Sequence, residues 1–453
     1  MNNTEVSALT ELIKINANKR SIKKWDFGAS FSNDYSVQVD RGIAKQLKAS
    51  QKQILTLRVW NKLGQVGITT TSDLSEDGLV KALLQASKAS EYGNKNEQTN
   101  FSPLAKEKIN YISTIDGKPS GIKKLLAVLR KAEQKLISKH VSITSVPYNG
   151  LSESFYKRIY ANSDGASRFF KKSQAVLYLY AKAEENKKKP RSSGSVKLGY
   201  QLKDIDIDKC INEAAEKTIS HLNYKPVETG KYKVCFTPEA FLTLINAFSS
   251  IFNARSIIDG VSITNKNSIG EIVASKSLNL YDNGSHEKNI TSAPFDGEGT
   301  PTRKLSIIKE GKLENLIHSE STARIFNTKP TGHAGLGSKV TVSPDWLIVE
   351  RSENISSLNE ELNNISYKGE YILIEELNAI HAGVKASQGA FSLPFDGWLV
   401  KKSEKISIES ATVAGDIRKV LNDIINIEDT QKVTTNGISP HVWINNLAIT
   451  GEA

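Results

Sequence analysis

The sequence predicts an α+β fold with a curved, largely antiparallel sheet in its C-terminal part. Hairpin turns recur between strand-like runs, as at Asn61–Gly64 and Glu310-Gly311, and tight turns of this kind join antiparallel strands. Amphipathic helical stretches are separate from these hairpins, and the clearest one in the middle section covers Ile122–Lys139. Because strands and helices do not alternate regularly, we do not expect a doubly wound parallel sheet.

We expect three units along the chain. Residues 1–100 form an N-terminal α/β unit, residues 101–226 a middle α+β unit, and residues 227–453 a large C-terminal β-rich, peptidase-like domain with a few helices. The polar stretch Gly93–Asn100 marks the first boundary, and Pro226–Gly230 marks the second.

In the first two units, alternating or β-branched runs predict strands, and apolar residues at helical spacing predict helices. An amphipathic helix is expected over residues 5–20, and Ser75 is expected to cap a helix over Leu79–Ser90. The other expected elements are strands at Trp25–Phe31, Tyr35–Val39, Ile54–Trp60, Val66–Thr71, Val141–Pro147, Phe155–Asn162 and Phe169–Ala183, a loop at Lys187–Gly194 and a helix at Asp208–His221.

In the third unit, a strand at Lys231–Phe236 runs into Thr237-Pro238-Glu239, which is a typical helix start. Thr can cap such a helix, Pro fits its first position, and Glu suits its first turn. Further hairpins are expected around Glu310-Gly311, Lys402-Ser403-Glu404 and Asn445-Asn446, and a short helix over Asp416–Ile425.

Composition indicates a globular protein of ordinary hydrophobicity, with 39% apolar and 24% charged residues among 453. Two cysteines provide no disulfide framework, and neither a signal peptide nor a long apolar run is evident, so we expect a cytoplasmic location and no membrane. The net charge of +11 could indicate an anionic partner. Because the lysines are distributed, we interpret the charge as a solvated surface and do not expect nucleic acid to bind.

A Gly-rich acidic turn in the C-terminal unit is the first candidate site. It comprises Phe295, Asp296, Gly297, Glu298, Gly299 and Thr300 and is followed by Pro301. Its two carboxylates could act as an acid–base pair or could cap backbone amides, and both alternatives stay open. The glycines of Thr331–Gly337 favour close approach of another part of the backbone.

Motifs for metal or nucleophilic chemistry are missing. His286-Glu287 starts like a zinc-binding helix, but no second histidine follows at the required spacing. The spacing of His318, His333 and His381 indicates no metal site, and Cys235 lies in an apolar strand where thiols usually pack. The sequence also lacks a nucleophile elbow and a phosphate loop.

The order of several short motifs resembles the TldD/PmbA family of metallopeptidases over nearly the whole chain. The matching segments are Val37–Gly42, Thr56–Leu74, Pro294–Thr300, Gly383–Leu393, the hairpin after Asp396-Gly397, Ala411–Asp416 and Leu447–Gly451. The resemblance implies a zinc-type site in one branch, made by an H-E-x-x-x-H helix and a Cys near the C-terminus. In that site two imidazoles and a thiolate hold the ion, and the Glu serves as base.

At the aligned positions this chain has Asn246, Ala247 and Ile251, and Thr434–Ala453 contains no Cys. The expected ligands are therefore missing, which is the mark of the other branch, called PmbA or TldE. The resemblance then implies a subunit that is catalytically silent and has no cofactor of its own. Its partner would be a TldD-like paralogue that carries the zinc ion in a cytoplasmic heterodimeric peptidase.

Such a complex would degrade unfolded peptides or mature peptide precursors, and a homodimer in the absence of the partner is an open alternative. A peptide cleft beside the acidic turn would include residues 295–300 and His333. Two other interpretations stay open. One is a metallopeptidase in its own right with an unrecognised site, and the other is a basic protein that binds DNA or modulates gyrase.

Overall fold

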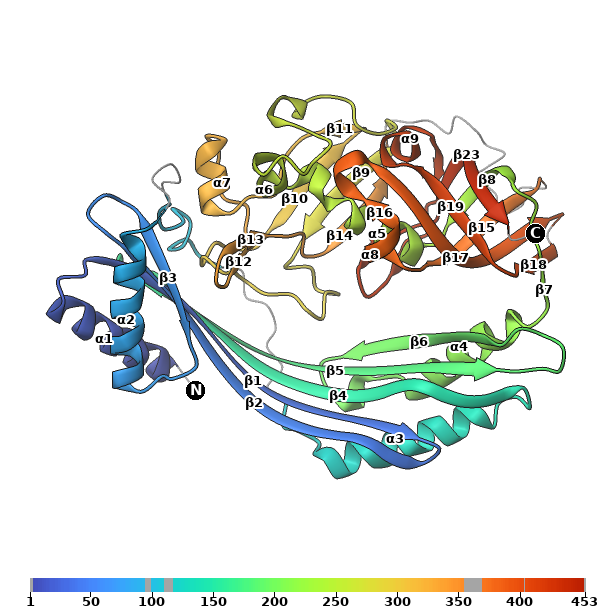
Figure 1. Ribbon diagram of the computed structural model, residues 1–453, viewed down its shortest axis with the longest axis horizontal. Coiled ribbons are helices and arrows are strands. Elements are labelled where there is room, and N and C mark those ends of the chain that lie inside the picture. Colours follow the sequence, from blue (N-terminus) through green and yellow to red (C-terminus); the bar gives the residue numbers. More distant parts are fainter. Residues whose placement is uncertain (1–2, 94–98, 110–116, 354–368, 403, 452–453) are drawn as a thin grey trace.

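The computed structural model describes residues 3–93, 99–109, 117–353, 369–402 and 404–451 and has the predicted α+β fold. Its first half forms a long curved antiparallel sheet. The strands are β1 (Lys24–Asp40), β2 (Ile43–Trp60), β3 (Val66–Thr71), β4 (Ile143–Asn162), β5 (Ser167–Ala183) and β6 (Arg191–Gly199). They lie in the order β3-β2-β1-β4-β5-β6, and the C-terminal half lies against the concave side (Figure 1).

This sheet draws on both of the first two predicted units. Strand β1 pairs with β2 through a tight turn in which Arg41 and Gly42 have φ angles of 49° and 76°, and its other edge pairs with β4. Residues 1–100 and 101–226 therefore share one layer. A tight turn over residues 162–165 leads from β4 toward β5, with Gly165 at φ 89°.

Three details of the predicted strands are wrong. The runs 25–31 and 35–39 belong to the single strand β1, because residues 32–34 pair with both β2 and β4. The runs predicted at 141–147 and 155–162 lie in the single strand β4, which begins at Ile143, because the segment between them pairs with β5 from Tyr148 to Ser154. The loop predicted at Lys187–Gly194 ends early, since β6 begins at Arg191 and pairs with Ala183. In all three places backbone pairing outweighs a polar local composition.

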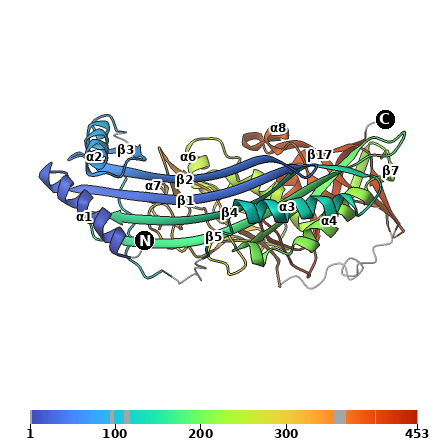
Figure 2. The same ribbon diagram turned by 90° about the horizontal axis from the view of Figure 1, so that it is seen from below.

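Two pairs of helices cover the ends of the sheet (Figures 1 and 2). Helices α1 (Asn3–Lys19) and α2 (Glu76–Ser90) pack at one end, and α3 (Ile122–Ile137) and α4 (Ile207–Ser220) share a core with β1, β4 and β5 at the other. The Oγ of Ser75 accepts a hydrogen bond from the Gly78 N–H at 3.2 Å, so the predicted cap is confirmed. No helix in the described ranges is long and apolar enough to cross a membrane.

The C-terminal half contains two larger sheets. The first has the order β11-β10-β9-β14-β22-β21. Its strands are β9 (Leu278–Asn283), β10 (Lys304–Lys309), β11 (Lys312–Leu313), β14 (Leu347–Arg351), β21 (Lys432–Val433) and β22 (Gly437–Ser439). The hairpin predicted at Glu310-Gly311 joins β10 to β11, with φ angles of 48° and 76° at these two residues.

The second sheet has the order β15-β8-β23-β19-β17-β18-β7, and an added pairing of β15 with β17 closes part of it on itself. Its strands are β7 (Tyr224–Lys225), β8 (Gly230–Phe236), β15 (Tyr371–Leu377), β16 (Val384–Lys385), β17 (Ala390–Lys401), β18 (Glu404–Ile408), β19 (Ala411–Asp416), β20 (Ile424–Ile427) and β23 (Val442–Gly451). A separate two-stranded sheet contains β12 (Ala334–Leu336) and β13 (Val340–Val342).

The hairpin predicted at Asn445-Asn446 is wrong. Strand β23 continues through these residues and pairs with β8 on both sides of a bulge between Ile444 and Leu447. Asn446 has a φ of 59°, because Asn tolerates the left-handed conformation in a bulge as well as in a turn.

Short helices connect and cover these sheets. They are α5 (Pro238–Ala247), α6 (Ala254–Ile258), α7 (Glu320–Ile325), α8 (Ile380–Gly383) and α9 (Ile417–Asn422), with 3₁₀ turns η1 (Leu202–Asp204), η2 (Ser249–Phe252), η3 (Lys266–Ser268) and η4 (Ala386–Gln388). Helix α5 begins as predicted, because the Thr237 Oγ1 accepts from the Ala240 N–H at 3.3 Å.

Candidate functional site

The Gly-rich acidic turn lies buried between the long sheet and the C-terminal half. Both carboxylate oxygens of Asp296 accept backbone hydrogen bonds. Its Oδ1 accepts from the N–H groups of Glu298 at 2.8 Å and Thr300 at 2.9 Å, and its Oδ2 accepts from the Ala334 N–H at 2.9 Å. Burial and the neighbouring Glu298 charge raise the pKa of Asp296 to about 7. Asp296 thus shapes the turn and ties it to β12.

The glycines of the turn allow two close contacts. A Cβ on Gly297 would lie 2.4 Å from the backbone nitrogen of Leu336 in β12. Gly299 has a φ of +75°, and a Cβ there would lie 2.4 Å from the ring of Tyr160 in β4. Each glycine is therefore required by close packing, and Gly299 also by its backbone conformation.

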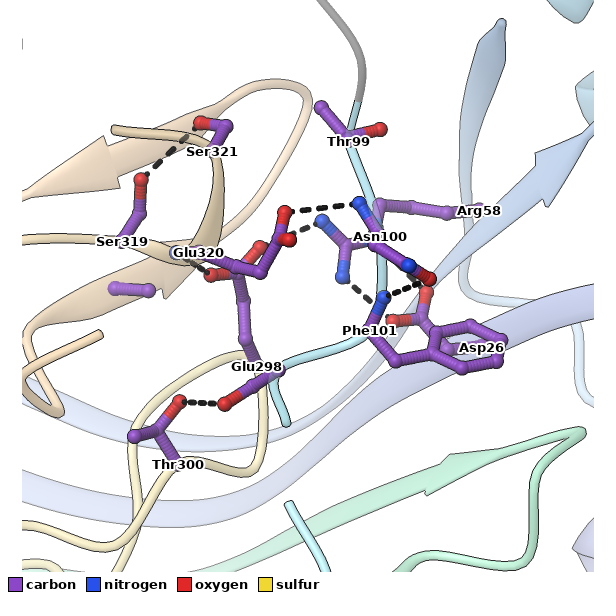
Figure 3. Close-up of polar contacts among 12 residues, drawn as sticks. Asp26, Arg58, Thr99, Asn100, Phe101, Glu298, Thr300, Ser319, Glu320 and Ser321 are labelled. Atoms are coloured by element: carbon purple, nitrogen blue, oxygen red, sulfur yellow. Dashed lines mark hydrogen bonds and ion pairs between the residues drawn. The ribbon is translucent and has the colours of Figure 1, made fainter. Parts of the chain in front are cut away.

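Glu298 takes part in a buried ionic network with Arg58 of β2 and Asp26 of β1 (Figure 3). The guanidinium bonds both oxygens of Asp26, at 2.9 Å from Nε to Oδ1 and 2.5 Å from Nη2 to Oδ2, and its Nη1 lies 2.7 Å from Oε1 of Glu298. Tyr160 donates its hydroxyl to Oδ2 of Asp26 at 2.9 Å. Burial alone would lower the pKa of Arg58, but the two carboxylates raise it well above its usual value.

The network continues to helix α7. The second oxygen of Glu298 accepts from the Glu320 N–H at 2.7 Å, and the Glu320 carboxylate accepts from the Asn100 N–H at 2.8 Å and from Arg324 (Figure 3). The acidic turn, the long sheet and α7 are thereby held together. Both Asp296 and Glu298 use their carboxylates in bonds that stabilise this junction.

A cavity of about 440 Å³ opens beside the turn. Asp296 and Gly297 line it together with Arg158, residues 28–30 of β1 and residues 334–339. Of the residues of the predicted cleft, Asp296 and Gly297 therefore line this cavity.

His333 lies in a buried polar cluster. Its Nδ1 lies 2.8 Å from the hydroxyl of Thr331, and its Nε2 lies 3.1 Å from Oδ1 of Asp282 in β9. Burial lowers the pKa of His333, but the adjacent Asp282 carboxylate outweighs this and raises it overall. Together with Asp345, these residues place ligand atoms within 4.8 Å of one another, which within the described ranges is the one group with the geometry to hold a metal ion.

The other two histidines of the C-terminal part behave differently. His318 is buried near His333, and burial lowers its pKa to about 4, whereas His381 is exposed in α8. Asp282 and Asp345 were missed by sequence reasoning. Asp282 is far from His333 in sequence, and strand pairing of β9 with β14 brings Asp282 beside Asp345.

The resemblance implies that α5 corresponds to the metal-binding helix of the other branch. Asn246 and Ala247 are half-buried in its last turn, and Ile251 is buried in η2. An amide, a methyl and a branched alkyl group are not zinc ligands, so these residues do not fit a zinc ion at this position.

A larger cavity, about 1000 Å³, lies beside α5. Glu239, Ala240 and Thr243 of α5 line it, opposite β6 and α4, and the helical repeat places Asn246 on the same face as Glu239 and Thr243. The charged residues in its wall are Lys197, Lys209, Glu213, Glu216, Lys217, Glu239, Lys288, Glu375, Glu376, Lys405 and Lys432. A cavity of this size can admit a peptide segment.

These features define an α+β protein with a peptide-sized cavity beside α5, whose last turn has Asn246 and Ala247 where the resemblance implies a zinc site. Residues 106–222 match the PmbA/TldA metallopeptidase central domain, and residues 229–451 match the PmbA/TldA metallopeptidase C-terminal domain. The chain belongs to the PmbA/TldD family of metallopeptidases.

Among curated proteins, metalloprotease PmbA of Escherichia coli O157:H7 is 24% identical over 329 residues, which cover 71% of this chain and 68% of the relative. A zinc metalloprotease TldD homologue of Saccharolobus solfataricus is 24% identical over 349 residues, with 71% and 75% covered.

Two solved structures show the same fold. A candidate modulator of a DNA gyrase from Thermotoga maritima has a TM-score of 0.86 at 23% identity, covering 98% of this chain and all (100%) of that one. TldE from Thermococcus kodakarensis has a TM-score of 0.84 at 19% identity, with the same coverage.

Proposed function

We propose that this chain is the non-catalytic, PmbA/TldE-like subunit of a cytoplasmic TldD-type metallopeptidase complex. The observation that carries the proposal is the last turn of α5, where the resemblance implies metal-site residues and this chain has Asn246 and Ala247. Three coordinating groups are needed to fix a catalytic zinc ion, and α5 offers none of the expected type. The zinc ion and the hydrolytic chemistry then belong to a TldD-like partner.

The contribution of this chain is a binding wall for unfolded peptides. The cavity wall mixes lysines and glutamates and includes residues 432–436, which contain the edge strand β21. An edge strand can pair with an extended peptide, and mixed charges can bind polar side chains of either sign. Two β6 carbonyls, those of Ser193 and Ser195, already accept hydrogen bonds from Thr218 and Cys210 of α4, so β21 is the better edge for an added strand.

The mixed wall also argues against DNA as the main ligand. A nucleic-acid site gathers lysines and arginines on one surface with few acidic residues. In the cavity beside α5, glutamates such as Glu213, Glu375 and Glu376 line the wall together with lysines. The net charge of +11 is therefore not concentrated there.

The test is a peptidase assay on this chain, on its TldD-like paralogue and on the co-purified pair, using an unfolded polypeptide. We expect hydrolysis by the pair, loss of that hydrolysis with a chelator, and no hydrolysis by this chain alone. The matched control is the pair with the H-E-x-x-x-H glutamate of the paralogue replaced by Gln. Chelator-sensitive hydrolysis by this chain, with the paralogue rigorously excluded, would contradict the proposal.

A further inference from the structure

Another part of the chain, away from α5, has side chains that can coordinate a metal ion. Asp282 is the penultimate residue of β9, His333 immediately precedes β12, and Asp345 precedes β14. Pairing of β9 with β14 places Leu347 opposite Asp282, which brings the loop with Asp345 beside that carboxylate. One imidazole nitrogen and two carboxylate oxygens then lie within 4.8 Å of one another.

Two atoms of this cluster are buried without a hydrogen bond. Asp282 is 0% exposed and His333 is 4% exposed. Their Oδ1 and Nε2 atoms are 3.1 Å apart, yet within the described part of the chain neither forms an aligned hydrogen bond. Buried polar atoms without partners are costly, and a cation between them would remove that cost.

The surroundings orient both atoms toward the same point. Oδ2 of Asp282 accepts from the N–H groups of Asp345 at 2.8 Å and Trp346 at 3.2 Å, which leaves Oδ1 for another partner. The Thr331 hydroxyl lies 3.2 Å from the His318 carbonyl and 2.8 Å from Nδ1 of His333. If Thr331 donates to that carbonyl, His333 donates its Nδ1–H to Thr331, and Nε2 keeps a free lone pair for a metal ion.

The spacing of the two buried atoms suits coordination. Two ligands about 2.1 Å from one ion lie about 3.0–3.4 Å apart at right or tetrahedral angles, which includes the observed 3.1 Å. Asp345 is exposed, and its carboxylate lies over Gly284, where a Cβ would approach Oδ2 to 2.4 Å. This side chain can therefore turn toward the ion, and the ion can enter from solvent.

We propose that Asp282, His333 and Asp345 bind a divalent transition-metal ion of the zinc or manganese type. A mixed nitrogen and oxygen ligand set favours these ions over calcium or magnesium, which prefer oxygen ligands alone. The ion joins β9 and the Asp345 loop to the segment that leads into β12, and β12 in turn contacts the acidic turn. Its role is to hold this junction, and it goes beyond the proposed function, which requires no metal ion in this chain.

The experiment uses the full chain without a histidine tag, stripped with EDTA and dialysed. It is titrated with ZnCl₂ and with MnCl₂ while bound metal is measured by mass spectrometry and Tm by differential scanning fluorimetry. We expect about one ion per chain and a rise in Tm that EDTA reverses, because an ion that binds only the folded state stabilises it. Failure of both ions to bind stoichiometrically would overturn the proposal.

Two variants assign the site. Asp345→Asn changes an exposed side chain, so the fold is retained, and the affinity is expected to fall at least about tenfold. Asp164→Asn, at another exposed aspartate, is its control. His333→Asn should also lose the ion, whereas His318→Asn should keep it.

If His333→Asn fails to fold, Asp345→Asn decides alone, and unchanged binding in it places the ion elsewhere and overturns the assignment. Peptidase activity measured on the same preparations separates this result from the proposed function. Bound metal without hydrolysis supports both ideas, and hydrolysis by the isolated chain contradicts only the proposed function.

Discussion

Replacing Arg58 by Met removes the cation at the centre of the buried network. Arg58 is 1% exposed and makes three charge-assisted hydrogen bonds, two to Asp26 and one to Glu298. Met has a similar length and fills much of the space, so the main effect is electrostatic. The carboxylates of Asp26 and Glu298 are left buried without their counter-ion.

Breaking a buried ion pair from one side costs about 3–5 kcal/mol, because the remaining charge has no partner. Part of that cost can be relieved, since Asp26 keeps the Tyr160 hydroxyl and Glu298 keeps the Glu320 N–H. We therefore expect Arg58→Met to lower the free energy of unfolding by about 3 kcal/mol, at the lower end of that range. Adding Asp26→Asn and Glu298→Gln to this variant should recover much of the loss, because no buried charge then remains.

The assay is urea unfolding at pH 7, followed by far-UV circular dichroism and by tryptophan fluorescence. Trp60 reports on the network directly, since the Arg58 guanidinium lies 5.1 Å from its ring centroid. Arg58→Lys is the matched control that retains the charge but loses the planar, two-pronged contact. If Arg58→Met loses less than about 1 kcal/mol, the network does not hold the sheet to the acidic turn as we argue.

Three further predictions concern single side chains. Burial lowers the pKa of His318 to about 4, so its contribution to the free energy of unfolding is present above its unfolded pKa of about 6.5 and is lost as pH falls toward 4. The loss should be about 3 kcal/mol in urea unfolding at several pH values. His318→Gln should lack this pH dependence. Gly299→Ala should cost at least about 2 kcal/mol by urea unfolding, and Gly165→Ala only about 1, because both glycines have positive φ but only Gly299 would also meet an aromatic ring. Thr243→Trp places an indole ring in the cavity beside α5 and should reduce peptide hydrolysis by the co-purified pair at least tenfold, whereas Thr144→Trp, on an exposed face, should not. Equal rates for the two variants would show that the cavity does not contribute to the activity.

The parts of the fold that sequence predicted best depend on local chemistry. The turn at Glu310-Gly311 and the helix starts at Ser75 and Thr237 are confirmed, because each depends on one or two residues with strong conformational preferences. The same kind of local preference gave a wrong prediction at Asn445-Asn446, where Asn446 adopts the left-handed conformation in a β-bulge and not in a hairpin turn. Distinguishing a bulge from a turn requires knowledge of the pairing partner, β8.

The candidate site also depends on partners that are distant in the sequence. Sequence drew attention to the acidic turn and to His333, but not to the residues that determine what they do. Arg58 lies 240 positions from Glu298, and Asp282 pairs with His333 only after two sheets have formed. Because the choice between acid–base chemistry and structural capping depends on such partners, the sequence left it open.

The poor fit of a zinc ion at the end of α5 reflects the backbone as well as the side chains. Helix α5 ends at Ala247, since Phe248 leaves helical geometry at φ −106° and ψ 21°, and Ile251 lies in the separate 3₁₀ turn η2. Ile251 packs in the C-terminal core at 5% exposure, so this position stabilises the fold. Two histidines placed at 246 and 251 would therefore lie on different elements, and the one at 251 would lie in the core. Helix α5 keeps its capped first turn, and its residues Glu239 and Thr243 line the cavity. A substitution at Thr243 therefore tests the role of this helix more directly than a substitution at Asn246.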